Sequence, residues 1–125
     1  MFTVERIYLK WEKPSEDLMD YLTAKLENVK YEKRKMFGQF AFFLNGNMFT
    51  GVFQSKIFLR FPQESKREIM ELHPEICHFE PRKGQIMKEY VTIPPEIVAN
   101  DQLLDQLLHS SVAYVSGLPS KKGKR

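Results

Sequence analysis

The stretch FAFFLNGNMFTGVFQSKIFLRF, residues 40–61, decides the fold of this chain. Aromatic-rich segments lie on both sides of Asn45-Gly46, and Asn and Gly tolerate the positive φ that a two-residue hairpin turn needs. A polar break at Gln54-Ser55-Lys56 then precedes a third apolar segment, residues 57–61. The pattern therefore predicts three antiparallel strands joined in sequence as a meander.

The predicted meander is apolar on both of its sides. An antiparallel sheet with one face in water normally alternates apolar and polar residues, and this one does not. We therefore expect both sides to be covered, by helices, by the N-terminal segment or by a second copy of the chain, which predicts a homodimer. With the turn at Asn45-Gly46, one side carries Phe40, Phe42, Leu44, Phe49, Phe53 and Phe58, and the other carries Ala41, Phe43, Met48, Val52, Ile57, Leu59 and Phe61.

Helical patterns lie on both sides of the meander. Residues 1–14 fit either an edge strand or an extended arm, and Ser15 is the predicted N-cap of a helix at about residues 16–29. A second helix begins after Pro62 and ends at His73-Pro74. Its expected inward residues are Ile69, Met70 and Leu72, and its expected solvent-facing residues are Glu64, Lys66, Arg67 and Glu68.

A strand and a helix complete the predicted domain. A loop that contains Pro81 and Gly84 precedes a predicted strand at residues 86–93, and Asn100 or Asp101 caps the last helix. The order α-β-β-β-α-β-α predicts an α+β two-layer arrangement. Three helices pack with an antiparallel sheet made of the three-strand meander and at least one further strand. The inward face of the last helix is Leu104, Leu107, Leu108, Ser111 and Val115.

Composition narrows the class of protein. A chain of 125 residues with 42% hydrophobic residues fits one folded domain, which we predict at residues 1–118. The net charge of +3 comes largely from a predicted disordered basic tail at 119–125, because removing its four bases leaves 15 basic against 16 acidic residues. No apolar run reaches the ~18 residues that a membrane span requires. Cys77 is the only cysteine, so no internal disulfide can form, and we expect a cytoplasmic protein.

Basic residues cluster immediately before the meander, in the segment KYEKRK at 30–35. The Phe-rich sheet offers a second route to nucleic acid, because aromatic side chains flanked by bases stack on unpaired nucleotides. We favour core packing of these rings, since the body of the chain is slightly acidic. The candidate contacts to a protein partner or to nucleic acid are Lys33, Arg34, Lys35, Phe37 and Lys88.

Catalytic and metal-binding patterns are weak. His73, Cys77 and His78 supply three metal-ligand residue types, but no second Cys or His pair complements them. Cys77 beside His78 has the residue types of a nucleophile and its base, yet adjacent side chains rarely meet productively. The sequence contains no Gly-rich phosphate loop, no GxSxG and no HExxH motif. We therefore expect no enzyme activity, no cofactor and no metal site.

An ordered series of short motifs resembles the N-terminal domain of the TfoX/Sxy competence-regulator family. The resemblance spans about residues 15–119, and the order of the motifs is more specific than any one of them. Gln39 and Arg82-Lys83 depart from the family pattern. The matching motifs are Lys35-Met36-Phe37-Gly38, Phe42, Asn45-Gly46-Asn47-Met48, Gly51-Val52, Leu59-Arg60, Gly84, Met87-Lys88-Glu89-Tyr90-Val91, Ser111, Tyr114 and Leu118-Pro119.

The resemblance implies an α+β fold similar to secretion-chaperone-like domains and a role in regulation rather than catalysis. Bacterial members of the family are linked to natural competence and its transcriptional control. Full-length regulators carry a second, helical domain, whereas a basic tail follows the motifs here, so we expect a stand-alone copy. The motif residues with expected structural roles are Met36, Gly38, Asn45, Gly46, Asn47, Gly51, Gly84 and Tyr90.

Together these observations predict a non-catalytic regulatory module that binds other proteins and acts in transcriptional regulation. The expected partners are a second copy of the chain and an unidentified regulatory protein, with no role for a membrane. The alternative is direct nucleic-acid binding through the basic residues and the tail.

Overall fold

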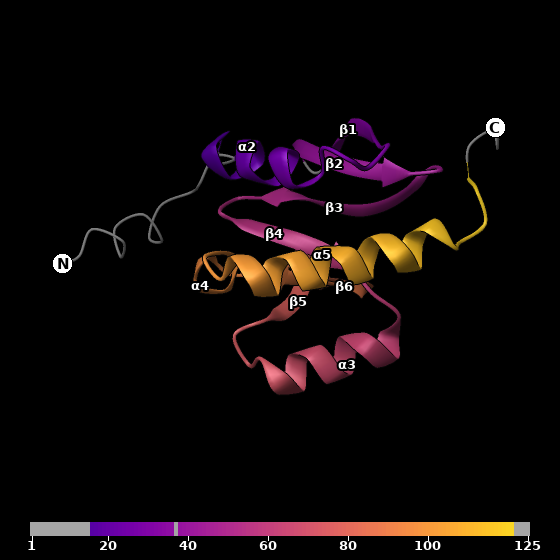
Figure 1. Ribbon diagram of the computed structural model, residues 1–125. Helices are drawn as coiled ribbons and strands as arrows, with labels where there is room; N and C mark the ends of the chain where they lie inside the picture. The colour runs from indigo at the N-terminus through magenta and orange to yellow at the C-terminus, as the bar shows by residue number, and fades with distance from the viewer. Residues whose placement is uncertain (1–15, 37, 122–125) are drawn as a thin grey trace.

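The computed structural model describes residues 16–36 and 38–121, which form one six-stranded antiparallel sheet with helices packed against it (Figure 1). The strand order across the sheet is β1-β2-β3-β4-β6-β5. The predicted α+β class is confirmed. In chain order the elements are α2 (Glu16–Lys25), β1 (Glu32–Met36), β2 (Gln39–Leu44), β3 (Asn47–Phe53), β4 (Lys56–Arg60), α3 (Gln63–Leu72), β5 (Cys77–Arg82), β6 (Gln85–Ile93), α4 (Pro95–Val98) and α5 (Asp101–Ser116).

The predicted meander is present as β2, β3 and β4. Asn45 and Gly46 form the tight turn between β2 and β3, with φ of 52° and 82°, and Leu44 pairs with Asn47 across it. Both turn residues thus have the left-handed backbone that the Asn-Gly sequence predicts. The first prediction of the sequence is confirmed in position and in turn chemistry.

Two edge strands were not expected from the sequence. β1 pairs with β2 although four of its five residues are exposed, and β5 pairs with β6 although it contains Pro81. Strands at the edge of a sheet need no continuous apolar pattern, because only one side of their backbone is paired and charged side chains there prevent unwanted pairing. Proline is also tolerated at an edge. The loop predicted around Pro81 is therefore a strand, and the sheet has two more strands than the four named from the sequence.

Helices α2, α4 and α5 cover one face of the sheet (Figure 1). We call the cluster of buried residues between these helices and the sheet the helix-covered core. Asn100 caps α5, because its side-chain oxygen accepts a hydrogen bond from the Leu103 backbone N–H at 3.2 Å. The buried residues of α5 are the five that the sequence predicted, namely Leu104, Leu107, Leu108, Ser111 and Val115. The helical periodicity of this segment therefore predicted its packing face correctly.

The opposite face of the sheet is also buried, and it is buried within one chain. We call this group the aromatic cluster; it consists of Ala41, Phe43, Met48, Phe58, Phe79 and Tyr90, and none is more than 8% exposed. Phe79 on β5 stacks on Phe58 of β4 with ring centroids 4.4 Å apart, although β6 lies between their strands. The sheet must therefore curve onto itself, and bulges next to Phe43 and Phe79 allow such bending.

The predicted sides of the sheet were partly wrong, because a bulge changes the alternation. Phe42 pairs with Thr50 while Phe43 pairs with Met48, so β3 holds one extra residue at Phe49. Each residue after this point changes sides relative to a regular strand. Phe53 and Phe58 consequently pack with the aromatic cluster, whereas Val52, Ile57, Leu59 and Phe61 join Phe42, Leu44 and Phe49 in the helix-covered core.

Helix α3 has the predicted bounds but not the predicted faces. Lys66, expected in solvent, is its one buried residue at 6% exposure, and Leu72, expected inward, is 75% exposed. Lys66 lies three and four residues before Ile69 and Met70, so helix geometry places it on the inward face despite its charge. Within residues 16–36 and 38–121, no helix is both long and apolar enough to cross a bilayer.

Candidate functional site

Strand β1 carries most of the predicted contact residues at an outer edge of the sheet. Lys33 pairs with Phe42, Arg34 with Ala41 and Lys35 with Phe40. Successive side chains of a strand point to opposite faces, so three consecutive bases cannot form one continuous patch. Lys33 and Lys35 lie on one face of β1, and Arg34 lies on the other.

The Lys33 and Lys35 face includes an exposed aromatic ring. The Lys33 Nζ lies 4.7 Å from the centroid of the Phe40 ring, and Phe40 is 41% exposed. The negative face of the aromatic ring attracts the ammonium, and such a contact contributes about 0.5–1 kcal/mol at an exposed site. We call Lys33, Lys35 and Phe40 the basic edge. Sequence reasoning missed Phe40 as a surface residue, because the run of aromatic residues from Phe40 to Phe43 hides which ring lies at the margin of the sheet.

Arg34 packs on the other face, at the margin of the aromatic cluster. Its guanidinium carbon lies 4.4 Å from the Phe43 ring centroid, and its Nη2 donates to Glu32 Oε1 at 2.9 Å. These contacts fix Arg34 as a cover for Phe43 and partly neutralise its charge. Met36 also packs against the aromatic cluster. Phe37 lies outside the residues that the structure describes.

The structure does not bring Lys88 to the basic edge. Lys88 is an exposed residue of β6, and β2, β3 and β4 separate β6 from β1 in the sheet. The sequence grouped it with Lys33, Arg34 and Lys35 by charge alone, and charge carries no information on strand order. Lys88 instead lines a pocket next to α3.

The Asn45-Gly46-Asn47 turn is a docking point for the C-terminal segment. The Asn47 side-chain amide donates to the Pro119 carbonyl at 2.9 Å, and the Lys121 backbone N–H donates to the Asn45 carbonyl at 2.8 Å. Ser120 Oγ also lies 3.4 Å from the Asn45 carbonyl. The first three residues of the segment predicted as a disordered tail are therefore bonded to the turn.

Three further glycines of the motifs, and Tyr90, occupy positions in the sheet and its turns that explain their residue types. A Cβ on Gly51 would lie 2.6 Å from a Phe58 ring carbon and 2.7 Å from the Phe40 carbonyl oxygen, so a larger residue cannot fit. Gly38 lies between β1 and β2, and Gly84 lies between β5 and β6, where its N–H donates to Glu80 Oε2 at 2.6 Å. The Tyr90 hydroxyl donates to the Met48 carbonyl at 2.9 Å, and burial raises the pKa of Tyr90 to about 12.

A polar network surrounds Glu89 on β6. Arg60 Nε donates to Glu89 Oε1 at 2.8 Å, and the Tyr114 hydroxyl donates to Glu89 Oε2 at 2.8 Å. Burial, followed by this hydrogen bond to a carboxylate, raises the pKa of Tyr114. The Arg60 guanidinium also lies 5.6 Å from the Tyr90 ring centroid. Because both carboxylate oxygens are bonded, this network ties α5 to β4 and β6.

Cys77 and His78 do not form a catalytic pair. They are consecutive exposed residues of β5, so their side chains project from opposite faces of the strand. Cys77 Sγ is a free thiol 3.6 Å from the Glu75 carbonyl. Among the residues described, no group of three or more His, Cys, Asp and Glu side chains could hold a metal ion.

A known protein family matches most of the residues that form this fold. A family model described as the TfoX N-terminal domain matches residues 20–114 of the 125-residue chain. The matched range begins within α2, contains all six strands and ends within α5. No curated protein matches the chain significantly.

Proposed function

The chain belongs to the TfoX N-terminal domain family, and from this premise we propose that it is a non-catalytic, cytoplasmic regulatory module that binds a protein partner through its basic edge. The family is a regulatory one and is not known as catalytic. We further propose that the partner acts in transcriptional regulation.

One observation carries the proposal: β1 is an outer strand whose exposed face combines two lysines with an accessible ring. Among residues 16–36 and 38–121, β2 is the one strand that pairs with β1, so the outer side of β1 can offer backbone donors and acceptors to a partner. A partner can add an extended segment to such an edge and gain main-chain hydrogen bonds. Phe40 supplies the apolar contact, and Lys33 and Lys35 favour an acidic segment.

A second copy of the chain fits this edge less well than an acidic segment does. If β1 paired with its own copy about Arg34, antiparallel geometry would place Lys33 opposite Lys35 and Arg34 opposite Arg34. Like charges directly opposite each other destabilise a strand pair. The aromatic cluster needs no second copy to cover it either, because its residues are already buried within one chain. The homodimer stays a prediction without a surface assigned to it.

The test compares capture of partners by the wild-type chain and by the double variant Lys33→Glu, Lys35→Glu. The matched control is Arg82→Glu, Lys83→Glu, which makes the same charge change at exposed positions at the other end of the sheet. We expect a purified captured partner to bind the control as it binds the wild type, and to bind the basic-edge variant at least about tenfold more weakly. Equal binding by both variants would show that the partner uses another surface.

Nucleic-acid binding is the alternative function, and it is tested on the same variants. Lys33 over Phe40 is the kind of cation and aromatic pair on which an unpaired base could stack. Within β1, however, that face carries two cations, Lys33 and Lys35, and Arg34 and Lys88 lie elsewhere. The measurement is a titration with single-stranded DNA and RNA oligonucleotides at two salt concentrations. Salt-sensitive binding that the basic-edge variant loses would favour this function over protein binding.

A further inference from the structure

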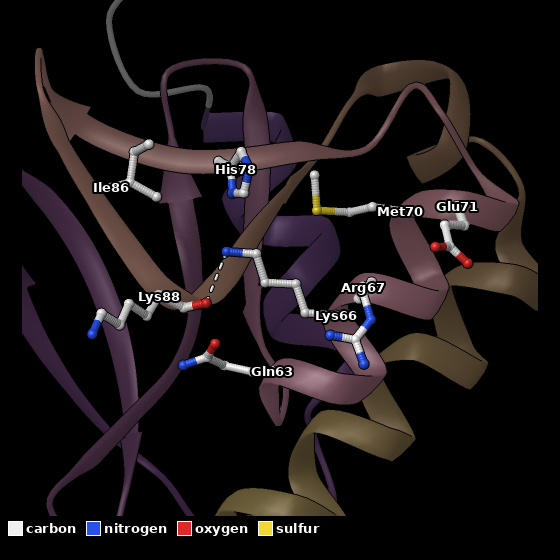
Figure 2. A pocket seen from close by; sticks show the side chains of 8 residues that line it. All are labelled: Gln63, Lys66, Arg67, Met70, Glu71, His78, Ile86 and Lys88. Atoms are coloured by element: carbon white, nitrogen blue, oxygen red, sulfur yellow. Dashed lines mark hydrogen bonds between the residues drawn. The ribbon is translucent and has the colours of Figure 1, made fainter.

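A pocket of about 510 Å³ lies between α3 and the β5–β6 hairpin, away from the basic edge. Its lining includes Lys66, Arg67 and Met70 of α3, Ile86 and Lys88 of β6 and His78 of β5; in Figure 2 the Lys66 and Met70 side chains extend from α3 toward these strands, and the Lys88 side chain extends away from α3. Its volume falls in the range of about 300–1,000 Å³ that is usual for small-molecule sites. None of the contact residues proposed for the basic edge lines it.

The buried polar group in this pocket is the side-chain ammonium of Lys66. Lys66 is 6% exposed, and its Nζ donates to the Lys88 carbonyl at 2.8 Å and to the Met87 carbonyl at 3.4 Å. No ion pair joins Lys66 to an acidic residue in the part of the chain that the structure describes. Burial lowers the pKa of Lys66 accordingly. An ammonium has three N–H donors, so two carbonyl acceptors leave one donor for a ligand.

The charges around Lys66 have the same sign. Arg67 and Lys88 are exposed residues at the rim, and the one acidic residue of the lining is Glu71. In Figure 2 the Glu71 carboxylate lies at the far end of the pocket from the Lys66 ammonium. The field in the pocket therefore favours an anion, and a carboxylate or phosphate group would neutralise the buried charge.

Apolar atoms provide the rest of the lining. Ile86 is 50% exposed although it is a large aliphatic residue, and the Met70 side chain faces the same space across the pocket (Figure 2). Both would gain from contact with an apolar ligand, at roughly 25 cal/mol for each Å² removed from water. An inorganic anion alone would leave this surface wet.

We infer that the α3–β6 pocket binds a small amphipathic anion, which is an apolar chain that ends in a carboxylate or phosphate group. The anionic group contacts the Lys66 ammonium and Arg67, and the chain lies between Met70 and Ile86. This site is separate from the basic edge and does not depend on the function proposed above.

The test is a titration of the full-length, ¹⁵N-labelled chain followed by NMR, with octanoate and octyl phosphate as probes. We expect saturable shifts of the α3 and β6 amide signals with at least one of the two probes, and the stronger probe identifies the preferred anionic group. Octanol lacks the charge and inorganic phosphate lacks the chain, so each should bind at least about tenfold more weakly than the stronger probe. The inference is wrong if neither octyl probe saturates, or if octanol or phosphate binds as well.

Three variants locate the site. Lys66→Met should weaken binding of the octyl probe by about ten- to a hundredfold, as expected for loss of a hydrogen bond to a charged group. Arg67→Ala changes an exposed residue, so it tests the same pocket even if Lys66→Met folds poorly. Lys35→Met is the matched control on β1 and should bind as the wild type does. Wild-type affinity in Arg67→Ala and Lys66→Met would place the bound probe elsewhere and overturn the assignment.

Discussion

Helices α5 and α3 pack beside the same sheet but bury different chemistry. α5 buries four aliphatic residues and one hydroxyl, whereas the one residue that α3 buries is a lysine. Both helices direct a polar side chain at a strand carbonyl: Ser111 Oγ donates to the Arg60 carbonyl and Lys66 Nζ to the Lys88 carbonyl, each at 2.8 Å. A neutral hydroxyl is satisfied by that bond, but a cation keeps its charge.

The comparison separates a helix that completes the core from one that leaves a pocket open. The buried residues of α5 belong to the helix-covered core. The Glu89 network ties the C-terminal half of α5 to the sheet through the hydroxyl of Tyr114. α3 contributes only partly buried apolar residues, Ile69 and Met70, to that core. The buried charge on α3 is costly for the fold unless something neutralises it.

The largest expected effect comes from emptying the α5 interface. Leu104 is fully buried, so Leu104→Ala should reduce the free energy of unfolding by about 3–4 kcal/mol through lost burial and the cavity left behind. The same kind of truncation on α3, Ile69→Ala, should cost about 1–2 kcal/mol, because Ile69 is only partly buried. Chemical denaturation of both variants measures the difference. Equal losses would mean that the two helices contribute alike to the core.

A smaller loss is expected when the neutral polar contact of α5 is removed. Ser111→Ala deletes the donor to the Arg60 carbonyl inside the core and should cost about 1–2 kcal/mol. Ser110 lies next to it on the exposed side of the same helix, so Ser110→Ala should change stability by less than about 0.5 kcal/mol. Denaturation curves of the two alanine variants provide a matched pair. A neutral Ser111→Ala variant would show that the bond contributes nothing net.

The same contrast explains which parts of the fold the sequence could predict. The predictions of the α5 packing face and of the Asn45-Gly46 turn were correct, because the residue types there suit their positions in the fold. Apolar residues recur with helical spacing along α5, and the two turn residues have the φ that the turn requires. Lys66 was assigned to solvent because its type and its position disagree. Its spacing to Ile69 and Met70 was a signal for burial that its charge obscured.

The edge strands and the bulge were beyond single-sequence reasoning for a different reason. β1, at Glu32–Met36, has no alternation of apolar and polar residues. It is held by backbone pairing with β2, the next strand in the chain, rather than by burial of apolar side chains. The extra residue at Phe49 leaves no mark in a stretch where almost every residue is apolar. The basic residues were therefore found, but their division between two faces of a strand was not.

Tyr90 extends the comparison to a buried group that is neutral at ordinary pH and is bonded to a carbonyl, as Ser111 is. Tyr90→Phe removes the donor to the Met48 carbonyl and should cost about 1 kcal/mol near pH 7. The pKa of Tyr90 is raised from 10.0 to about 12, so its contribution is fully present below pH 10 and is lost as pH rises through about 12. Wild-type stability should thus fall more steeply than that of Tyr90→Phe across this interval, as followed by denaturation at fixed ionic strength.

Lys66→Met should have the smallest effect near neutral pH, and its pH dependence should have the opposite sign. The variant loses two hydrogen bonds to carbonyls but also removes a buried, unneutralised charge, so we expect the two effects to cancel to within about 1 kcal/mol at pH 7.

The pKa of Lys66 is lowered by burial, so below 10.5 the unfolded chain binds the proton more tightly than the folded chain does. Folded wild type should therefore gain stability relative to Lys66→Met as pH rises toward 10.5, and tyrosine ionisation, which both proteins share, cancels from this difference. Denaturation of both proteins at pH 7, 8.5 and 9.5 measures this slope, with Lys35→Met as an exposed control that should show none. A flat difference for Lys66→Met would mean that the ammonium is solvated in the native state, and α3 would then differ from α5 in packing alone.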